Sequence, residues 1–339
     1  MPLLYIFLST ELASGLLRNN NILMTIRDAN STFINIQPEL HEAIDEGRPV
    51  VALESTLISH GLPWPDNLET AVACEDAVRQ AGALPATISI IDGVIQIGTS
   101  PAMLERLARN GQADIQKASR RDIPAVVVAG ATAATTVSAT AFLARSAGIC
   151  FMATGGIGGV HRGAGQTFDI SCDLIELGRA GHPMALVCSG VKSILDIPAT
   201  LEKLETLGVP VIGYQTREFP AFTEYSSGLP MDHSVADPES AAKLFSTHEM
   251  LEMPTIMLFA QPCSRELSLD EHLADKARVQ ALAEAASQGV MGKAITPFLL
   301  GRVSELTLGQ SLRVNKQLII NNAATAGQIA AAYSRLIRR

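Results

Sequence analysis

One local pattern recurs along this chain: a short run of apolar residues, a loop of small residues, and then a segment with helical spacing. The apolar runs stand at residues 49–53, 149–153, 184–188 and 209–213. A strand that is apolar along its whole length is buried on both faces, as in a parallel sheet covered by helices. The pattern therefore predicts βαβ units with right-handed crossovers, and with them a three-layer α/β/α fold around a largely parallel central sheet.

Three further segments add detail to this fold. The segment 87–97 predicts a small hairpin, because its Asp92-Gly93 dipeptide favours a type I′ turn. The continuous apolar run 125–129 is expected to form another buried strand. Residues 318–321 are expected to be extended before the last helix.

Length, charge and cysteine usage narrow the class of protein. The chain has 339 residues, a net charge of −8 and five cysteines, which suits one large α/β domain. We assign that domain to residues 31–339 and expect residues 1–30 to be an unstructured or weakly ordered extension. The acidic charge argues against a nucleic-acid polymer as partner, but it is compatible with a small basic pocket for one phosphorylated ligand. No apolar run is long enough to span a membrane, and the cysteine spacing matches no zinc site, so we expect a cytoplasmic protein with free thiols.

Two residues at strand ends are candidates for catalysis, because ligands of open α/β sheets gather at the carboxyl ends of the strands. Glu54 follows the run 49–53, and Lys192 follows the run 184–188 and a Ser-Gly pair. A desolvated lysine is a nucleophile able to form a Schiff base, and a half-buried carboxyl is a candidate general acid. The alternatives are a lysine that extends to solvent and a glutamate that accepts hydrogen bonds within its own turn.

The segment 154–163 is dense in glycine and contains His161 and Arg162. It does not match the dinucleotide-binding fingerprint, and no GKS or GKT of a P-loop occurs in the chain. Glycines of this kind let backbone N–H groups approach an anion closely. They are equally typical of a tight loop that needs positive φ angles.

Asp169 and Asp173 are four residues apart, so on a helix they would share a face. Two carboxylates completed by water molecules suit Mg²⁺ or Mn²⁺. The alternative is a solvated acidic helix start with Ser171 as its capping residue.

Lys117, Arg120 and Arg121 form the densest basic cluster of this acidic chain. They suit a phosphate group or, alternatively, ion pairs on the surface. Thr135 and Thr136 precede a predicted helix, where hydroxyls and free N–H groups also suit phosphate. Together, the candidates indicate a site that contains a carboxylic acid and a reactive lysine. Its ligands would be a small phosphorylated molecule and a hard divalent cation.

Several segments also occur in an order that resembles the pseudouridine-5′-phosphate glycosidase family. They are VALESTLISHGLP, KASRRD, ATGGIGGVHRG, FDISCD, GVKSILD, PVIGYQT and TPFLL. The resemblance runs from about residue 36 to the C-terminus, and GGIGGVHRG and KSILD are highly specific. It implies an α/β fold, a homotrimer and Mn²⁺ as cofactor. It also implies reversible cleavage of pseudouridine 5′-phosphate to uracil and ribose 5-phosphate.

The resemblance implies a role for each residue that matches the family pattern. The nucleophilic lysine falls on Lys192, the proton-donating glutamate on Glu54, the second active-site lysine on Lys117, and the metal-binding aspartate on Asp169. The residues implied on the substrate side are Thr136 and Val137 near the phosphate, Lys117, Thr154, His161, Ser171, Cys172 and Asp173, and Asn321 or Asn322 facing the uracil.

Two positions depart from the family pattern. Cys172 replaces the usual alanine and is small enough to be tolerated. The family carries a Ser-Xaa-Arg segment that corresponds to Ser234-Val235-Ala236 here, so Ala236 replaces its arginine. Any role of that arginine in holding phosphate or the trimer is therefore in question.

The implied chemistry suits these residue types. A carbon–carbon glycosidic bond offers no leaving-group oxygen or nitrogen to protonate, so the two-carboxylate scheme of ordinary glycosidases does not apply. Lys192 would attack C1′ of an opened ribose to give an iminium, Lys117 would assist ring opening, and Glu54 would protonate uracil C5. Two alternatives stay open. One is a same-fold C-glycosidase of the indigoidine-pathway type that acts on another phosphosugar conjugate, and the other is a phosphosugar-binding protein without catalysis.

Overall fold

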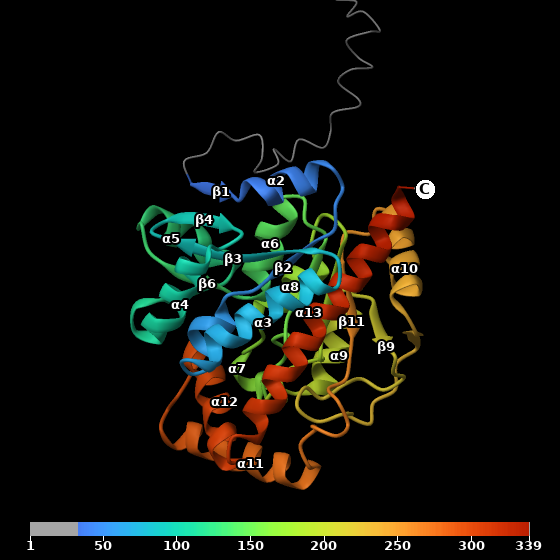
Figure 1. Ribbon diagram of the computed structural model, residues 1–339. Coiled ribbons are helices and arrows are strands. Elements are labelled where there is room, and N and C mark those ends of the chain that lie inside the picture. The colour runs from blue at the N-terminus through green and yellow to red at the C-terminus, as the bar shows by residue number, and fades with distance from the viewer. Residues whose placement is uncertain (1–32, 339) are drawn as a thin grey trace, which may run out of the picture.

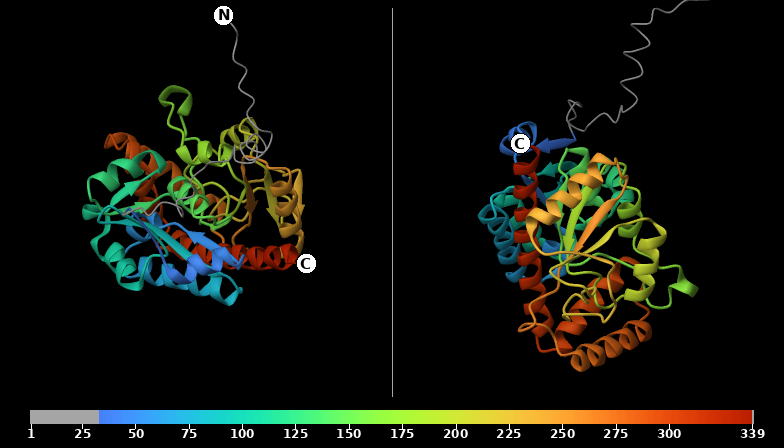
Figure 2. Two further views of the ribbon diagram at one scale, coloured as in Figure 1. Left: turned by 90° about the horizontal axis from the view of Figure 1, so that it is seen from above. Right: turned by 90° about the vertical axis from the view of Figure 1, so that its right-hand side faces the viewer.

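The computed structural model of the protein describes residues 33–338 (Figure 1). The extension expected at residues 1–30 lies outside the described residues. A mostly parallel sheet forms the centre, and helices cover both of its faces (Figures 1 and 2). The α/β architecture predicted from the repeated apolar runs is therefore confirmed.

The strands pair in an order that brings distant parts of the chain together. They are β1 (Ile34–Ile36), β2 (Val50–Leu53), β3 (Leu84–Ile91), β4 (Val94–Ile97), β5 (Gln116–Ala118), β6 (Ala133–Thr135), β7 (Phe151–Ala153), β8 (Met184–Cys188), β9 (Val211–Tyr214), β10 (His233–Val235) and β11 (Ile256–Ala260). The order across the sheet is β1-β4-β3-β2-β7-β8-β11-β9-β10, and β6 pairs with both β3 and β5. The pairs β3–β4 and β3–β6 are antiparallel, whereas β2, β7 and β8 run parallel and end at one edge.

Two groups of helices enclose the sheet. The helices are α2 (Pro38–Asp45), α3 (Asp66–Gln80), α4 (Pro101–Asp114), α5 (Ile123–Val128), α6 (Val137–Ser146), α7 (Ala164–Thr167), α8 (Cys172–Gly178), α9 (Ile197–Thr206), α10 (Pro238–Met250), α11 (Glu271–Ser287), α12 (Ile295–Leu306) and α13 (Gln310–Ile337). Helix α13 packs between α3 and α10 against one face, and α6, α8 and α9 pack in succession on the other (Figure 2). None of the helices between residues 33 and 338 combines the length and the apolar character needed to traverse a bilayer.

The predicted hairpin forms from β3 and β4, which pair antiparallel. At its turn Asp92 has φ 50° and Gly93 has φ 78°, the two positive values that a type I′ turn requires. Arg106 holds the turn through two hydrogen bonds to the carboxylate of Asp92, at 2.7 and 2.6 Å.

Two predictions about extended segments were wrong. The apolar run 125–129 belongs to helix α5, which buries Ile123 and Val126 at helical spacing and leaves the side chain of Val128 exposed. A short apolar run has no periodicity that separates a buried strand from a helix. Residues 318–321 lie inside α13, which buries Val314, Leu318 and Asn322 at intervals of four residues.

Candidate active site

Three residues predicted from the sequence to belong to the site follow the carboxyl ends of three neighbouring strands. Glu54 follows β2, Thr154 follows β7, and Lys192 lies in the loop after β8. Paired positions in β2 and β7, Leu53 and Ala153, place Glu54 beside Thr154, whose hydroxyl donates a hydrogen bond to the Glu54 carboxyl. The parallel register of β2 and β7 therefore places Glu54 next to Thr154, which lies a hundred residues later in the chain.

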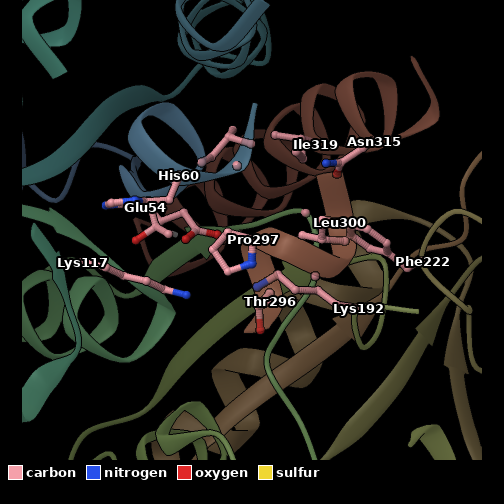
Figure 3. Close-up of a pocket in the computed structure, with 15 residues that line it drawn as sticks. Glu54, His60, Lys117, Lys192, Phe222, Thr296, Pro297, Leu300, Asn315 and Ile319 are labelled. Carbon is pink, nitrogen blue, oxygen red and sulfur yellow. The ribbon is translucent and has the colours of Figure 1, made fainter. Parts of the chain in front are cut away.

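Lys117 reaches the same place from strand β5. In Figure 3 the side chains of Lys117 and Lys192 extend toward each other from opposite sides, and Glu54 lies next to the space between them. Burial raises the pKa of the Glu54 carboxyl, although the charges of Lys192 and Lys117 and the hydrogen bond from Thr154 act in the opposite direction. A buried carboxyl of this kind holds its proton more firmly than an exposed one.

Two cavities of different character meet at these residues. The polar cavity, of about 380 Å³, is lined by polar groups that include Ser119, Arg121, Thr136, His161, Asp169 and Ser171. The apolar cavity is lined by Leu57, Phe222, Pro297, Leu300 and Ile319, together with His60 and Asn315 (Figure 3). Glu54, Lys117 and Lys192 line both cavities, as do Thr56 and Thr296. The three residues predicted to be catalytic thus lie at the junction of a polar and an apolar space.

The polar cavity gathers most of the residues predicted on the substrate side. Thr136 stands at the N-cap of α6 and Ser171 at the N-cap of α8, and both line the cavity. Val137 and Cys172, the first residues of those helices, line it as well. The N-terminus of a helix offers N–H groups and a positive dipole end to an anion, so this cavity suits a phosphate group.

The residues of the basic cluster predicted from the sequence, Lys117, Arg120 and Arg121, do not all reach this cavity. Lys117 and Arg121 line the polar cavity, whereas Arg120 forms an ion pair with the buried carboxylate of Glu176, at 2.7 Å. Thr135 is fully buried, and its hydroxyl donates a hydrogen bond to the carbonyl of Ile88, at 2.7 Å. Thr136, and not Thr135, is therefore the threonine placed to meet a ligand.

His161 and Asp169 form one wall of the polar cavity, with 3.9 Å between His161 Nδ1 and the Asp169 carboxylate. Burial lowers the pKa of His161; Asp169 opposes this shift, and the charges of Lys117 and Lys192 add to it. His161 is therefore a neutral hydrogen-bonding group near pH 7, and the Asp169 carboxylate beside it is partly exposed.

Asp173 differs from Asp169 in what it binds. One oxygen of its carboxylate accepts the N–H of Ser138 at 3.0 Å, and the other accepts the N–H of Gly158 at 2.9 Å. Helix α8 begins at Cys172, so the two aspartates do not share a helical face as the spacing predicted. Asp173 joins the glycine-rich loop to the start of α6, and both aspartates line the polar cavity.

The glycine-rich loop is explained by neither of the two sequence interpretations alone. Gly163 has the positive φ of one interpretation, at 80°, whereas Gly155, Gly156, Gly158 and Gly159 do not have a positive φ. A Cβ at Gly158 would lie 2.2 Å from the hydroxyl oxygen of Ser171, and one at Gly155 would lie 2.6 Å from Ile319. The loop needs glycine because neighbouring elements approach its backbone closely, and Gly158 thereby lines the polar cavity.

Asn321 and Asn322 do not line the cavities at the junction, and a role for either of them in facing the base stays a prediction. Asn322 is buried and its amide donates to the carbonyl of Thr154 at 2.9 Å and to Ser189 Oγ at 3.1 Å. Asn321 accepts a hydrogen bond from Gln317 on the helix surface. Asn315, two turns earlier on α13, lines the apolar cavity, and its Oδ1 is buried without a hydrogen-bond partner.

Several other lining residues were not assigned a role from the sequence. Phe222 comes from the loop after β9, and Thr296 with Pro297 from the start of α12. Thr296 and Pro297 begin the segment TPFLL, which is one of those that carried the resemblance, so this segment could have identified them from the sequence. Ala236, where the family has arginine, follows the edge strand β10 and lines neither cavity.

Comparison with known proteins agrees with this arrangement. The chain matches the model of the family described as indigoidine synthase A like protein over residues 39–332. A protein of Caldanaerobacter subterraneus named pseudouridine-5′-phosphate glycosidase is 51% identical over 306 residues, which cover 90% of this chain and 98% of that protein. The protein of that name from Escherichia coli K12 is 48% identical over 303 residues, which cover 89% of this chain and 96% of that protein.

Two solved structures are also similar. A prealnumycin C-glycosynthase in complex with ribulose 5-phosphate has a TM-score of 0.82 and 36% identity, covering 91% of this chain and 99% of its own. An indigoidine synthase A-like protein from Thermotoga maritima has a TM-score of 0.80 and 36% identity, covering 89% of this chain and 97% of its own. With matches of this length and identity, the chain belongs to the family described as indigoidine synthase A like protein, and the resemblance to the pseudouridine-5′-phosphate glycosidases is confirmed.

Proposed function

We propose that the protein is a C-glycosidase that reversibly cleaves pseudouridine 5′-phosphate to uracil and ribose 5-phosphate through a Schiff base on Lys192. The observation that carries the proposal is the junction at which Glu54, Lys117 and Lys192 line both a polar and an apolar cavity. The names of the relatives at 51% and 48% identity support the substrate. The ribulose 5-phosphate complex of the C-glycosynthase supports a pentose phosphate as the ligand class.

The two cavities suit the two halves of this substrate. The phosphate and ribose fit the polar cavity, with Thr136, Ser171 and Arg121 as the groups around the phosphate. The uracil ring fits the apolar cavity, where Phe222 and Ile319 contact its faces and Asn315 offers an acceptor to a ring N–H. The bond between C1′ and C5 then lies at the junction, within reach of the lysines and the glutamate.

The reaction balances with these three side chains and one water molecule. The Lys192 amine forms a bond to C1′ as the bond from C1′ to the ring oxygen breaks. Lys117 gives a proton to the departing oxygen and takes one from the Lys192 nitrogen, which leaves a neutral amine with a lone pair on C1′. The C1′–C5 bond then breaks, its electron pair stays on C5 and takes the Glu54 proton, and the nitrogen lone pair closes the iminium. Water hydrolyses the iminium, which releases ribose 5-phosphate and the free Lys192 amine, and the proton set free in this step returns to the Glu54 carboxylate.

Glu54 has the environment that this role requires. Cleavage needs a carboxyl that carries a proton near neutral pH, and burial raises the pKa of Glu54 in that direction. The synthetic direction uses the same group as a carboxylate that removes the C5 proton. Thr154 orients the carboxyl for both directions.

Mn²⁺ is the cofactor of this proposal, and Asp169 is the residue that would hold it. Within residues 33–338 no three His, Cys, Asp or Glu side chains are grouped to bind a metal. Ions of this kind do bind through one or two carboxylates and complete their shell with water and phosphate oxygens, so a single partly exposed carboxylate fits. A bound Mn²⁺ would supply positive charge that helps to order the phosphosugar.

The homotrimer and the cytoplasmic location are parts of the same proposal. The segment that carries α7 projects from the body of the molecule (Figure 2), and its residue Phe168 is 82% exposed, which supports an interface there. All five cysteines are free thiols, which supports a reducing compartment. Sedimentation equilibrium tests the trimer, and a monomer at micromolar concentration would refute it.

The test of the main proposal is uracil release, followed by ultraviolet absorbance and chromatography. Pseudouridine 5′-phosphate with Mn²⁺ is expected to give uracil and ribose 5-phosphate in equal amounts, and Lys192→Ala is expected to give neither. A same-fold C-glycosidase of the indigoidine-pathway type remains the second candidate, because the C-glycosynthase is also similar at 36% identity. It is favoured if uracil is not released while ribose 5-phosphate still forms a reducible adduct. Binding of ribose 5-phosphate without an adduct would point to a protein that only binds phosphosugars.

A further inference from the structure

A third cavity, of about 280 Å³, adjoins the apolar cavity. Gly61, Phe222, Leu300 and Asn315 line both spaces and therefore form the boundary between them. The third cavity does not include Glu54, Lys117 or Lys192 among its lining residues. We call it the extension cavity, because it continues the base-binding space beyond these four boundary residues.

The walls of the extension cavity combine apolar groups with hydroxyls. Leu300, Val303 and Leu312 supply apolar surface, and Ser304 and Ser311 supply hydroxyls. Glu305 at its edge is already paired with Arg302, at 2.6 Å, so its charge is compensated. Such walls suit an uncharged chain of a few carbons that ends in a hydroxyl, and they do not suit a second phosphate.

The geometry of the reaction directs one edge of the base toward this space. C5 of uracil must lie at the junction beside Lys192 and Glu54 for the C1′–C5 bond to break. The ring atom opposite C5 is C2, which is flanked by N1 and N3, so the edge N1–C2–N3 points away from the junction. Asn315 stands on that side, and its Oδ1 can accept a hydrogen bond from one ring N–H. The other ring nitrogen is then free to carry a substituent.

We infer that the extension cavity is an aglycone subsite that admits pyrimidinediones alkylated on N1 or N3. This inference rests on the proposed function and deepens it. The protein then acts on pseudouridine 5′-phosphate that carries a short alkyl or hydroxyalkyl group on one ring nitrogen. In the synthetic direction it couples the corresponding N-alkyluracil to ribose 5-phosphate.

Position 301 offers a way to fill this cavity without touching the junction. Gly301 lies inside α12 and lines the extension cavity, and a Cβ built there meets no atom within 4 Å. Gly301→Phe places a large side chain at this wall, and Gly301→Ala is the matched control that adds one methyl group to the same backbone. Ser304, one turn further along, gives a second pair: Ser304→Leu fills the cavity, and Ser304→Ala is its control.

The experiment measures kcat/KM for coupling ribose 5-phosphate to uracil, 1-(3-hydroxypropyl)uracil and 3-(3-hydroxypropyl)uracil, with products identified by mass. The unaltered protein is expected to couple one of the two alkylated isomers within about 10-fold of uracil, because the substituent enters a preformed space. Gly301→Phe and Ser304→Leu are expected to lower that value by about 10- to 200-fold, the range of pocket-size discrimination, while coupling of uracil changes little. The two alanine controls are expected to couple both bases as the unaltered protein does.

Three results would overturn the inference. The first is that neither isomer reacts although uracil does. The second is that filling the cavity lowers the values for uracil and its alkyl derivative equally. The third is a fall in kcat for uracil without a change in selectivity, which would make the extension cavity the path of uracil release. Failure of uracil itself to react would refute the proposed function and the subsite with it, so the two failures are distinguishable.

Discussion

Thr154 donates a hydrogen bond to the carboxyl of Glu54, and the two residues follow paired positions of adjacent parallel strands. The bond fixes the direction of a carboxyl whose pKa burial raises. A proton donor works best when its position and its protonation are set before the substrate binds. The backbone register of β2 and β7 therefore contributes directly to the chemistry at the junction.

Borohydride trapping is expected to place the covalent intermediate on Lys192. Reduction in the presence of ribose 5-phosphate should add the reduced sugar phosphate to the peptide that contains residue 192, as seen by mass spectrometry. Lys192→Arg is the matched control, because it keeps a positive charge beside Glu54 but offers no amine that can form an imine. An adduct of equal yield in Lys192→Ala would show that the Schiff base forms elsewhere.

The pH dependence of kcat, measured at saturating substrate, is expected to be opposite in the two directions. Cleavage uses protonated Glu54, so its rate should fall as the pH rises through the raised pKa of this carboxyl. Synthesis uses the carboxylate, so its rate should rise over the same interval. Glu54→Gln should remove this pH dependence and lower kcat by about 10²- to 10⁴-fold, the usual contribution of general acid–base catalysis. Parallel pH profiles of kcat for the two directions would contradict the role of Glu54.

Asp169 and Asp173 are expected to respond differently to the same substitution. Asp169→Asn should raise the Mn²⁺ concentration needed for half-maximal activity and change the free energy of unfolding by less than about 0.5 kcal/mol, because the side chain is partly exposed. Asp173→Asn should lower that free energy by about 1.5–3 kcal/mol, because an amide group cannot accept both N–H groups of Ser138 and Gly158. Unchanged Mn²⁺ dependence in Asp169→Asn would place the ion at other residues.

Asn322 and Asn321 are neighbours with different expected effects on stability. Asn322→Ala removes buried hydrogen bonds to Thr154 and Ser189 and should lower the free energy of unfolding by about 1–3 kcal/mol in urea titrations. Asn321→Ala should stay within about 0.5 kcal/mol, because it loses only a surface contact with Gln317. Equal losses in the two variants would show that Asn322 does not hold the loop ends.

Asn315 is expected to contribute to binding of the base. Asn315→Ala should raise the KM for uracil in the synthetic direction by about 3- to 10-fold, which corresponds to one lost hydrogen bond. The KM for ribose 5-phosphate should not change, because the residue lines the apolar cavity and not the polar one. Asn321→Ala, on the same helix, is the control. A rise in KM for ribose 5-phosphate alone would contradict the placement of the base.

The sequence by itself determined the class of fold and the residues at the junction. Fully apolar runs such as Met184–Cys188 have one stable environment, a sheet covered on both faces, and the structure has a strand with those bounds. Glu54 and Lys192 were recognisable because parallel strands end at one edge, so a polar residue just after an apolar run faces the ligand side. The type I′ turn at Asp92 was predictable for a similar reason, since its signal lies within two residues.

Only the tertiary structure decided which of several similar residues meets the ligand. Asn315, Asn321 and Asn322 lie on one helix, and its rotation against the sheet directs Asn315 to the apolar cavity and Asn322 to the loop carbonyls. Asp169 and Asp173 differ because distant N–H groups take up the carboxylate of Asp173. These outcomes depend on contacts between residues far apart in the chain, and such contacts leave no local signal in the sequence.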